Sequence, residues 1–284
     1  MSTLWVAGFG SDLAEDHPGF HDDVYKRRRA WISSLAREHR VSSGPIPRVE
    51  YTPEEVATWT HVLSKLKDLF PDHACQQYLS SFPYFNFQGD QVPQLEDISQ
   101  VLKSRTNWQV RPVAGLLHPR DFLAGLAFKC FHSTQYLRHH SQPSYTPEPD
   151  LCHELIGHMP MLANQGYADL VQAIGEASLG ADDKMVWHLT KVYWYTVEFG
   201  LIREGRDHIK AFGAGVLSSY GELKHIASGA PDLLPFDPFQ KLPKMSYKDG
   251  YQKAYFILDS FEDAEQKLRA LARAMKDPVQ PFSL

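Results

Sequence analysis

Apolar residues recur at helical spacing along much of this chain. Over residues 22–40 they fall on one helical face, and the pattern stops at the Ser-Ser-Gly-Pro sequence of residues 42–45. Thr52-Pro53-Glu54-Glu55 then joins an N-cap residue, a first-turn proline and acidic residues suited to the helix dipole, which predicts a helix running to about residue 69. Further helices are predicted near 72–81, 95–105, 119–127, from 151 onward, and over 166–178, 182–203, 219–228 and 261–275.

Strand signals are fewer and shorter. Residues 128–138 alternate and are rich in β-forming residues, and short strands are also expected near 207–212 and 251–257. Prolines at 143, 147 and 149 exclude regular helix over residues 139–150, so an ordered loop is expected there. The chain has no internal repeat or low-complexity linker. We therefore predict a mainly α fold with a minor β component, comprising a flexible N-terminal arm (1–15) and one domain (16–284).

Composition limits the classes of function. The chain has 284 residues, 43% of them hydrophobic, which is enough for a sizeable core. Its net charge of -5 provides no general attraction to nucleic acid or anionic lipid, and the basic run at 26–29 is interpreted as a solvated helix face. No apolar run approaches the ~20 residues of a membrane span, and no signal peptide is recognised. Three cysteines, an odd number, favour a reducing compartment, so a cytoplasmic protein without nucleic-acid or membrane partners is expected.

The richest chemical signal is the sequence CHELIGH at residues 152–158. It resembles the zinc-protease motif, in which two histidines four residues apart share a helical face. Here His158 follows His153 by five residues, which places them about 140° apart on an ideal α-helix. The two rings can still converge if one lies at a frayed first turn or beside a bulge, as the upstream prolines and Gly157 permit. The spacing therefore argues against a zinc hydrolase, which remains a remote alternative.

A third ligand is suggested by Glu198, which lies in the apolar segment 191–200. A helix over this segment would place it on a face with Trp194 and with residues 201 and 202. An unpaired carboxylate there would cost several kcal/mol or take up a proton, whereas a divalent cation would remove the difficulty. Two imidazoles and one carboxylate form the facial triad of non-haem iron sites. The alternative is an ordinary ion pair of Glu198 with Arg203 or Lys191.

Long ordered stretches of the sequence carry a family resemblance. From about residue 16 to about residue 273 the chain resembles the pterin-dependent aromatic amino-acid hydroxylases. The matching stretches are DHPGFHDDVYKRRR (16–29), IPRVEYTPEE (46–55), HAC (73–75), QLEDIS (94–99), RPVAGLL (111–117), RDFLAGLAFKCFHSTQYLRH (120–139), YTPEPDLCHELIGH (145–158), YWYTVEFGL (193–201) and GAGVLSSYGE (213–222).

The resemblance implies roles for individual residues. The iron ligands would be His153, His158 and Glu198, in agreement with the reasoning above. Arg138 would bind the amino-acid carboxylate and be held by Asp150, because a planar guanidinium fixes a carboxylate at two points. Further substrate contacts are expected from Thr146, Pro149, Trp194, Phe199, Gly215 and Ser218. Cofactor contacts are expected from Val113, Gly115, Leu116, Leu117, Phe122 (as a stacking ring), His132, Glu154 and Tyr193; for Val113, Leu116, Leu117 and Trp194, plain core packing is an equally good interpretation.

The implied activity is that of a single hydroxylase-type catalytic domain using Fe(II), tetrahydrobiopterin or a related tetrahydropterin, and O2. L-Phenylalanine is the expected substrate and L-tyrosine the product, with a 4a-hydroxypterin formed alongside. Hydroxylation of tyrosine at position 3 or of tryptophan at position 5 are the alternatives within the family, and the loop near 244–250, where selectivity is expected, does not decide between them. Without a regulatory domain or a C-terminal tetramerisation helix, the chain is expected to be a monomer or a weak dimer.

Overall fold

Capping signals in the sequence mark where the first helices begin. The structure is a computed structural model that describes residues 13–40, 44–144, 146–206, 208–245 and 250–276, so residues 1–12 of the expected arm lie outside the described residues. Asp22 caps helix α1 (Asp23–Glu38) by accepting the N–H groups of Val24 and Tyr25. Thr52 and Glu55 form a capping box at the start of α2 (Pro53–Lys67).

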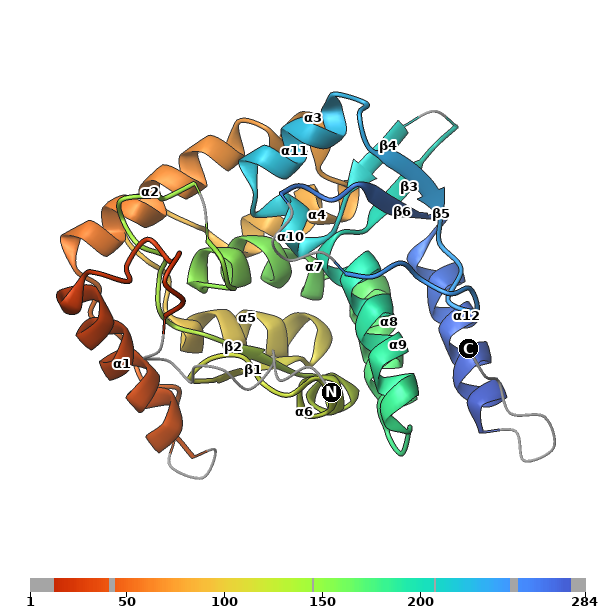
Figure 1. Cartoon of the computed structure of the whole chain (residues 1–284), viewed down its shortest axis with the longest axis horizontal. Helices are drawn as coiled ribbons and strands as arrows, with labels where there is room; N and C mark the ends of the chain where they lie inside the picture. The colour runs from red at the N-terminus through yellow and green to blue at the C-terminus, as the bar shows by residue number, and fades with distance from the viewer. Residues whose placement is uncertain (1–12, 41–43, 145, 207, 246–249, 277–284) are drawn as a thin grey trace.

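Most of the described chain is helical, as predicted, and is arranged as one domain around a continuous core (Figure 1). Helix α8 (Gln165–Ser178) packs between α6 (Pro119–Ala127) and α12 (Phe261–Met275), and its buried residues lie on nearly all sides. The other helical elements are α3 (Phe70–His73), α4 (Gln76–Ser81), η2 (Phe82–Phe85), α5 (Leu95–Thr106), η3 (His153–His158), α7 (Met159–Leu162), α9 (Asp183–Tyr193), η4 (Trp194–Glu198), α10 (Ala214–Leu217) and α11 (Tyr220–Ala227).

Two small sheets complete the domain. The first pairs β1 (Gln109–Pro112) with β2 (Cys130–Ser133) in parallel. The second has the strand order β4-β3-β6-β5, in which β3 pairs antiparallel with β4 and the other pairs are parallel. In Figure 1 this sheet lies beside α11, away from α1. Its strands are β3 (Leu201–Glu204), β4 (His208–Ala211), β5 (Asp232–Pro235) and β6 (Ala254–Leu258).

The helix predicted over 182–203 was too long. It ends at Glu198, and residues 201–204 form strand β3, so residues 201 and 202 do not share a helical face with Glu198. Gly200 stands at the break, because a Cβ there would lie 2.2 Å from the ring of Phe212 and 2.3 Å from the Thr196 carbonyl oxygen. Phe212, which directly follows strand β4, and the Thr196 carbonyl therefore leave no room for a side chain where the helix ends and the chain turns into β3.

The strand predicted over 128–138 is also shorter than expected. Only residues 130–133 are paired, and the chain beyond them continues buried and without a strand partner among the described residues. Two of its carbonyl groups are bonded by tyrosine hydroxyls, since Tyr51 donates to Gln135 O and Tyr25 donates to Leu137 O, both at 2.9 Å. The carbonyl between them, of Tyr136, accepts the backbone N–H of Leu151 at 2.8 Å. Isolated bonds from side chains and from one backbone N–H thus satisfy carbonyl groups that a sheet would otherwise satisfy.

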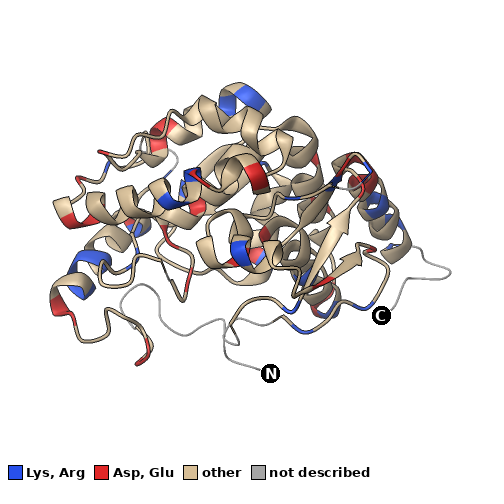
Figure 2. Cartoon of the chain, turned by 90° about the horizontal axis from the view of Figure 1, so that it is seen from above, with Lys and Arg blue, Asp and Glu red and all other residues tan. Residues whose placement is uncertain are grey.

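Charged residues of both signs are spread over the outer helices (Figure 2). The basic run of α1 is partly neutralised, because Arg28 pairs with Glu55 at 2.8 Å and Lys26 pairs with Asp23 at 2.6 Å. In the described part of the chain, no helix has the length and hydropathy that a bilayer crossing requires.

Candidate metal centre and binding cavity

Both histidines of the CHELIGH sequence lie in η3, a buried π-helical segment. Its hydrogen bonds run from residue i to i+5, so a residue five positions on returns to the same face. The Nε2 atoms of His153 and His158 are consequently 3.1 Å apart. The bulge that the sequence allowed is thus a full π segment. Gly157 allows α10 to pack closely on this π segment, because a Cβ at position 157 would lie 2.8 Å from the Cβ and the carbonyl oxygen of Ala214.

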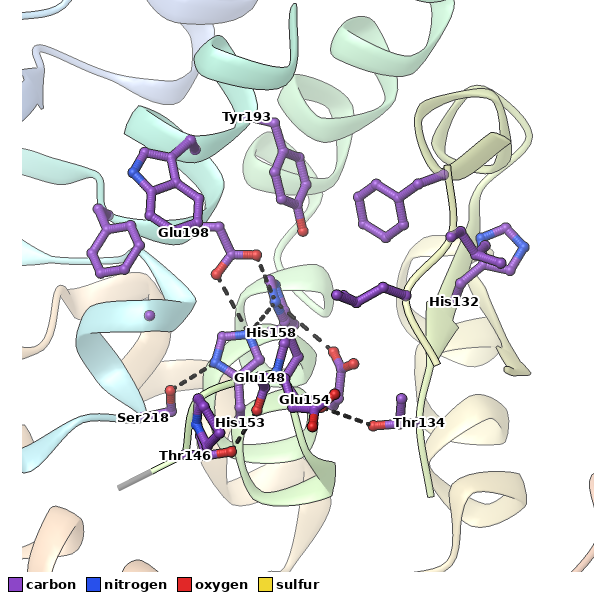
Figure 3. Close-up of a pocket in the computed structure, with 18 of the residues that line it drawn as sticks. His132, Thr134, Thr146, Glu148, His153, Glu154, His158, Tyr193, Glu198 and Ser218 are labelled. Atoms are coloured by element: carbon purple, nitrogen blue, oxygen red, sulfur yellow. Dashed lines mark hydrogen bonds and ion pairs between the residues drawn. The ribbon is translucent and has the colours of Figure 1, made fainter. Parts of the chain in front are cut away.

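Glu198 reaches the two histidines from η4, the π-helical continuation of α9. Its Oε2 lies 3.4 Å from Nε2 of His153 and its Oε1 lies 3.3 Å from Nε2 of His158 (Figure 3). Neither pairing suggested as an alternative is found: Arg203 pairs with Asp259, and Lys191 donates to Leu242 O. The structure therefore brings together the three residues that the sequence suggested as metal ligands.

The ligand atoms of these three residues lie at separations that suit one bound cation. Ligands held at about 2.1 Å from a first-row metal lie about 3.0 Å apart at right angles and about 3.4 Å apart in a tetrahedron. The two Nε2 atoms are 3.1 Å apart, and each lies 3.3 or 3.4 Å from a different oxygen of Glu198, so all three distances fall within that range. Nδ1 of His153 lies 2.9 Å from the hydroxyl of Ser218, which orients the ring from behind in the manner typical of metal-bound histidines. The residues present fit a divalent transition metal.

Burial and the attraction between the three side chains together determine their protonation states. Burial lowers the pKa of His153 to about 4, which leaves the imidazole neutral at pH 7 and able to offer a lone pair. Burial alone would raise the pKa of Glu198, but the attraction of His158 and His153 outweighs it and lowers the value to about 2. A neutral imidazole and an ionised carboxylate are the forms that bind a metal.

The ligand atoms open into a cavity of about 380 Å³. Eighteen of the nineteen site residues predicted from the sequence line it, and Asp150 lies behind Arg138, which does line it. The cavity walls come from the β1–α6 connection, β2, the proline-rich loop, η3, the end of α9 with η4, and the α10 region. The lining residues that were not predicted include Pro119, Leu123, Phe131, Thr134, Pro147, Glu148, Thr190, Ser219, Glu222, Gly250 and Gln252.

Arg138 and Asp150 form a buried ion pair at one end of the cavity. Asp150 accepts Nε–H of Arg138 at 2.9 Å and Nη2–H at 2.8 Å, and a third guanidinium N–H points to Pro143 O at 3.3 Å. Because a guanidinium carries five N–H donors, two remain available to a ligand among the described residues. Asp150 also accepts the backbone N–H of His153 at 3.1 Å, which couples this pair to the metal-binding segment.

The polar and aromatic residues near Arg138 differ in what they contact. The hydroxyl of Thr146 donates to Glu148 O at 2.5 Å, and that of Ser218 bonds to His153 as described. The rings of Trp194 and Phe199 lie with their centroids 4.7 Å apart and pack partly buried against the core. Gly215 leaves room for this pair, because a Cβ there would lie 2.7 Å from the ring of Phe199.

The opposite wall holds the residues predicted to contact a cofactor. The ring of Phe122 lies edge-on to Tyr193 at 5.1 Å, and Leu116 is 44% exposed at the rim. Burial lowers the pKa of His132 to about 4, and it raises the pKa of Glu154 well above its usual value, with Glu198 adding to the effect. His132 is therefore neutral near pH 7, and burial disfavours the charged form of Glu154, as suits a wall for a flat, largely neutral heterocycle.

Two of the lining residues that the sequence reasoning missed are joined to each other and to the aromatic wall by hydrogen bonds. Gln252 accepts the indole N–H of Trp194 at 3.2 Å, and its own backbone N–H is directed at Glu222 Oε1 at 3.4 Å. Glu222 is buried and also accepts the hydroxyl of Tyr255. A signal for Glu222 existed, because it ends the GAGVLSSYGE stretch. Gln252 belongs to no recognised motif.

Comparison with known proteins gives consistent matches. Residues 2–283 match the family described as biopterin-dependent aromatic amino acid hydroxylase. The phenylalanine 4-monooxygenase, chloroplastic, of Pinus taeda is 60% identical over 95% of this chain and 76% of its own length. That of Chlamydomonas reinhardtii is 62% identical over 96% and 75%.

Two further matches are informative about substrate and fold. The tyrosine 3-monooxygenase of Homo sapiens is 50% identical over 98% of this chain and 53% of its own length. A crystal structure of Chromobacterium violaceum phenylalanine hydroxylase with bound iron(III) and oxidised 7,8-dihydrobiopterin has a TM-score of 0.75. That structure is 31% identical and covers 86% of this chain and 90% of its own.

Proposed function

The chain belongs to the biopterin-dependent aromatic amino acid hydroxylases, and on that basis we propose that it hydroxylates L-phenylalanine to L-tyrosine with iron, a tetrahydropterin and O2. The observation that carries the proposal is one cavity combining the His153–His158–Glu198 group with a buried arginine and an aromatic wall. The relatives named phenylalanine 4-monooxygenase, at 60% and 62% identity, favour phenylalanine over tyrosine, for which the relative is 50% identical.

The protein's part in this reaction is to hold the iron and to orient the substrate beside it. His153, His158 and Glu198 would hold the iron at the cavity that they line. The two remaining donors of Arg138 would fix the substrate carboxylate, and orientation of this kind can supply a large share of a rate enhancement. When bound, the iron and the reduced pterin supply the activation of O2.

The apolar parts of the cavity select what fits beside the metal. Trp194 and Phe199 would pack against the substrate ring, and Phe122 would stack on the pterin. Gln252 supports the indole of Trp194, so it would act on the ring pocket indirectly. The loop near 244–250, where selectivity was expected, falls largely on residues 246–249, which lie outside the described residues.

Turnover of each amino acid by the purified, Fe(II)-loaded protein with tetrahydrobiopterin tests the proposal. We expect tyrosine from phenylalanine at a higher kcat/KM than any product from tyrosine or tryptophan. A higher kcat/KM for tyrosine or tryptophan would contradict the substrate assignment. Hydrolysis without oxygen uptake would instead favour the remote alternative of a zinc hydrolase.

Compartment and assembly remain predictions. Cys75, Cys130 and Cys152 are buried and free, which supports a reducing compartment. The plant and algal relatives are named as chloroplastic, whereas the cytoplasm is our expectation for this chain. We also propose a monomer or weak dimer, which light scattering of the eluted protein would test.

A further inference from the structure

A second group of potential metal ligands lies at the N-terminal end of α1, where Asp22 faces His139 and His140. In the part of the chain that the structure describes, only two groups bring three such side chains within 4.8 Å of one another, and the other is the group in the cavity. The two groups share no residue. Asp22 comes from the start of α1, and the histidines directly follow Arg138 in the chain.

The carboxylate of Asp22 is held in one orientation. Its Oδ1 accepts the backbone N–H groups of Val24 and Tyr25, both at 2.9 Å, as the N-cap of α1. Its Oδ2 is left to face Nε2 of His139 at 3.2 Å. A carboxylate fixed through one oxygen presents the other without further loss of side-chain freedom.

His139 is equally well oriented for a ligand. It is 6% exposed, and its Nδ1 lies 2.7 Å from the hydroxyl of Ser141 and 3.3 Å from the backbone nitrogen of the same residue. A cation bound at Nε2 would select the tautomer in which Nδ1–H donates to that hydroxyl, which is the arrangement typical of a metal-bound histidine. The ring of His140 lies 4.3 Å from that of His139 and is exposed, so it can turn to complete the set.

We propose that Asp22, His139 and His140 bind a divalent first-row transition metal, with water completing the coordination. Imidazole nitrogen and carboxylate oxygen suit Zn²⁺, which serves as the probe. The cation would join α1 to the segment that carries Arg138, reinforcing the bond from the Tyr25 hydroxyl to Leu137 O. Because one ligand is exposed, the site is expected to bind more weakly than the group in the cavity.

Equilibrium dialysis against Zn²⁺ followed by metal analysis tests the proposal. We expect two equivalents per chain for the parent protein, and one for Asp22→Asn and for His140→Ala. Asparagine caps a helix as well as aspartate does, so Asp22→Asn removes the charge and keeps the cap. The matched control is His208→Ala, which removes an exposed histidine on β4 and is expected to keep both equivalents.

A thermal measurement separates this site from the cavity. In Glu198→Ala, Zn²⁺ at roughly 100-fold above its Kd is expected to raise Tm by about 6 °C through the second site. Adding Asp22→Asn to that variant should abolish the rise. A single equivalent in the parent that Asp22→Asn does not remove, or a second equivalent that survives both Asp22→Asn and His140→Ala, would overturn the proposal whatever reaction the cavity catalyses.

Discussion

Replacing Asp150 by asparagine separates the structural role of the buried ion pair from its role in binding. The carboxylate is fully buried and accepts three N–H groups of Arg138, from the backbone at 2.7 Å, from Nε at 2.9 Å and from Nη2 at 2.8 Å. Asparagine has the same shape but only one oxygen, so it can keep the backbone N–H of Arg138, bonded to Oδ2, or that of His153, bonded to Oδ1, but not both. It leaves the guanidinium, itself 6% exposed, without a counter-charge.

The size of the effect follows from that burial. Breaking a buried pair by removing one partner costs about 3–5 kcal/mol, which for a chain of this size lowers Tm by about 10 °C. The guanidinium also loses one of the two bonds that fix its plane, because asparagine has a single side-chain oxygen. The KM for phenylalanine should therefore rise by about tenfold, which corresponds to about 1.4 kcal/mol of lost substrate binding.

The double variant Arg138→Met/Asp150→Asn distinguishes the two effects. It removes both charges, so its free energy of unfolding should exceed that of Asp150→Asn by about 1–2 kcal/mol. Its KM should not recover, because the carboxylate-binding donors are gone. Urea unfolding of the metal-free proteins and chromatographic measurement of tyrosine formation provide the two readouts.

Two results would refute this reasoning. A loss of less than about 1 kcal/mol in Asp150→Asn would mean that the guanidinium finds water or another partner, so that the pair does not behave as buried. A parental KM in the double variant would remove Arg138 from the substrate site.

Three other predictions address the metal group, the helix packing and the pH dependence. Glu198→Ala should lose most of the bound iron after gel filtration, as measured by metal analysis, and retention of parental iron would exclude this residue as a ligand. Gly157→Ala should lower the free energy of unfolding by about 1–3 kcal/mol because its methyl group meets Ala214, while Gly89→Ala, with ordinary contact at 3.8 Å, should unfold like the parent in urea. His132 has a folded pKa of about 4 against 6.5; the unfolded chain therefore binds more protons between these values, and stability should fall as pH drops from 6.5 to 4. His132→Gln should show a shallower fall in pH-dependent urea unfolding, and an unchanged slope would contradict the assignment.

Local chemistry made part of this fold predictable. The caps at Asp22 and Thr52 are read from a few adjacent residues, and the structure confirms the starts of both helices. The three potential metal ligands were also predictable. His153 and His158 belong to a recognisable motif, and a carboxylate such as Glu198 in an apolar segment needs a positively charged partner. Their convergence was expected, but the π-helical hydrogen bonding that produces it was not, because no local preference specifies it.

The features that were not predicted from the sequence depend on packing between residues that are distant in the chain. Strands β1 and β5 were not predicted, because each is four residues long and exists through a partner distant in the chain. The buried extended segment after Ser133 was predicted as a strand because its side chains are those of a strand, yet two tyrosine hydroxyls and one backbone N–H bond its carbonyls in place of a neighbouring strand. The support of Trp194 by Gln252 joins residues 58 positions apart and has no sequence signature.

A single residue in η3 separates its sequence from the zinc-protease motif. Without Gly157 the segment would read His-Glu-Leu-Ile-His, in which the two histidines are four residues apart, as in the zinc-protease motif on an ordinary α-helix. One inserted residue, accommodated as a wider turn, therefore separates two metal chemistries that use the same side chains. A sequence-pattern search that allows a one-residue gap would not distinguish the two motifs, whereas the backbone hydrogen bonding of the helix does distinguish them.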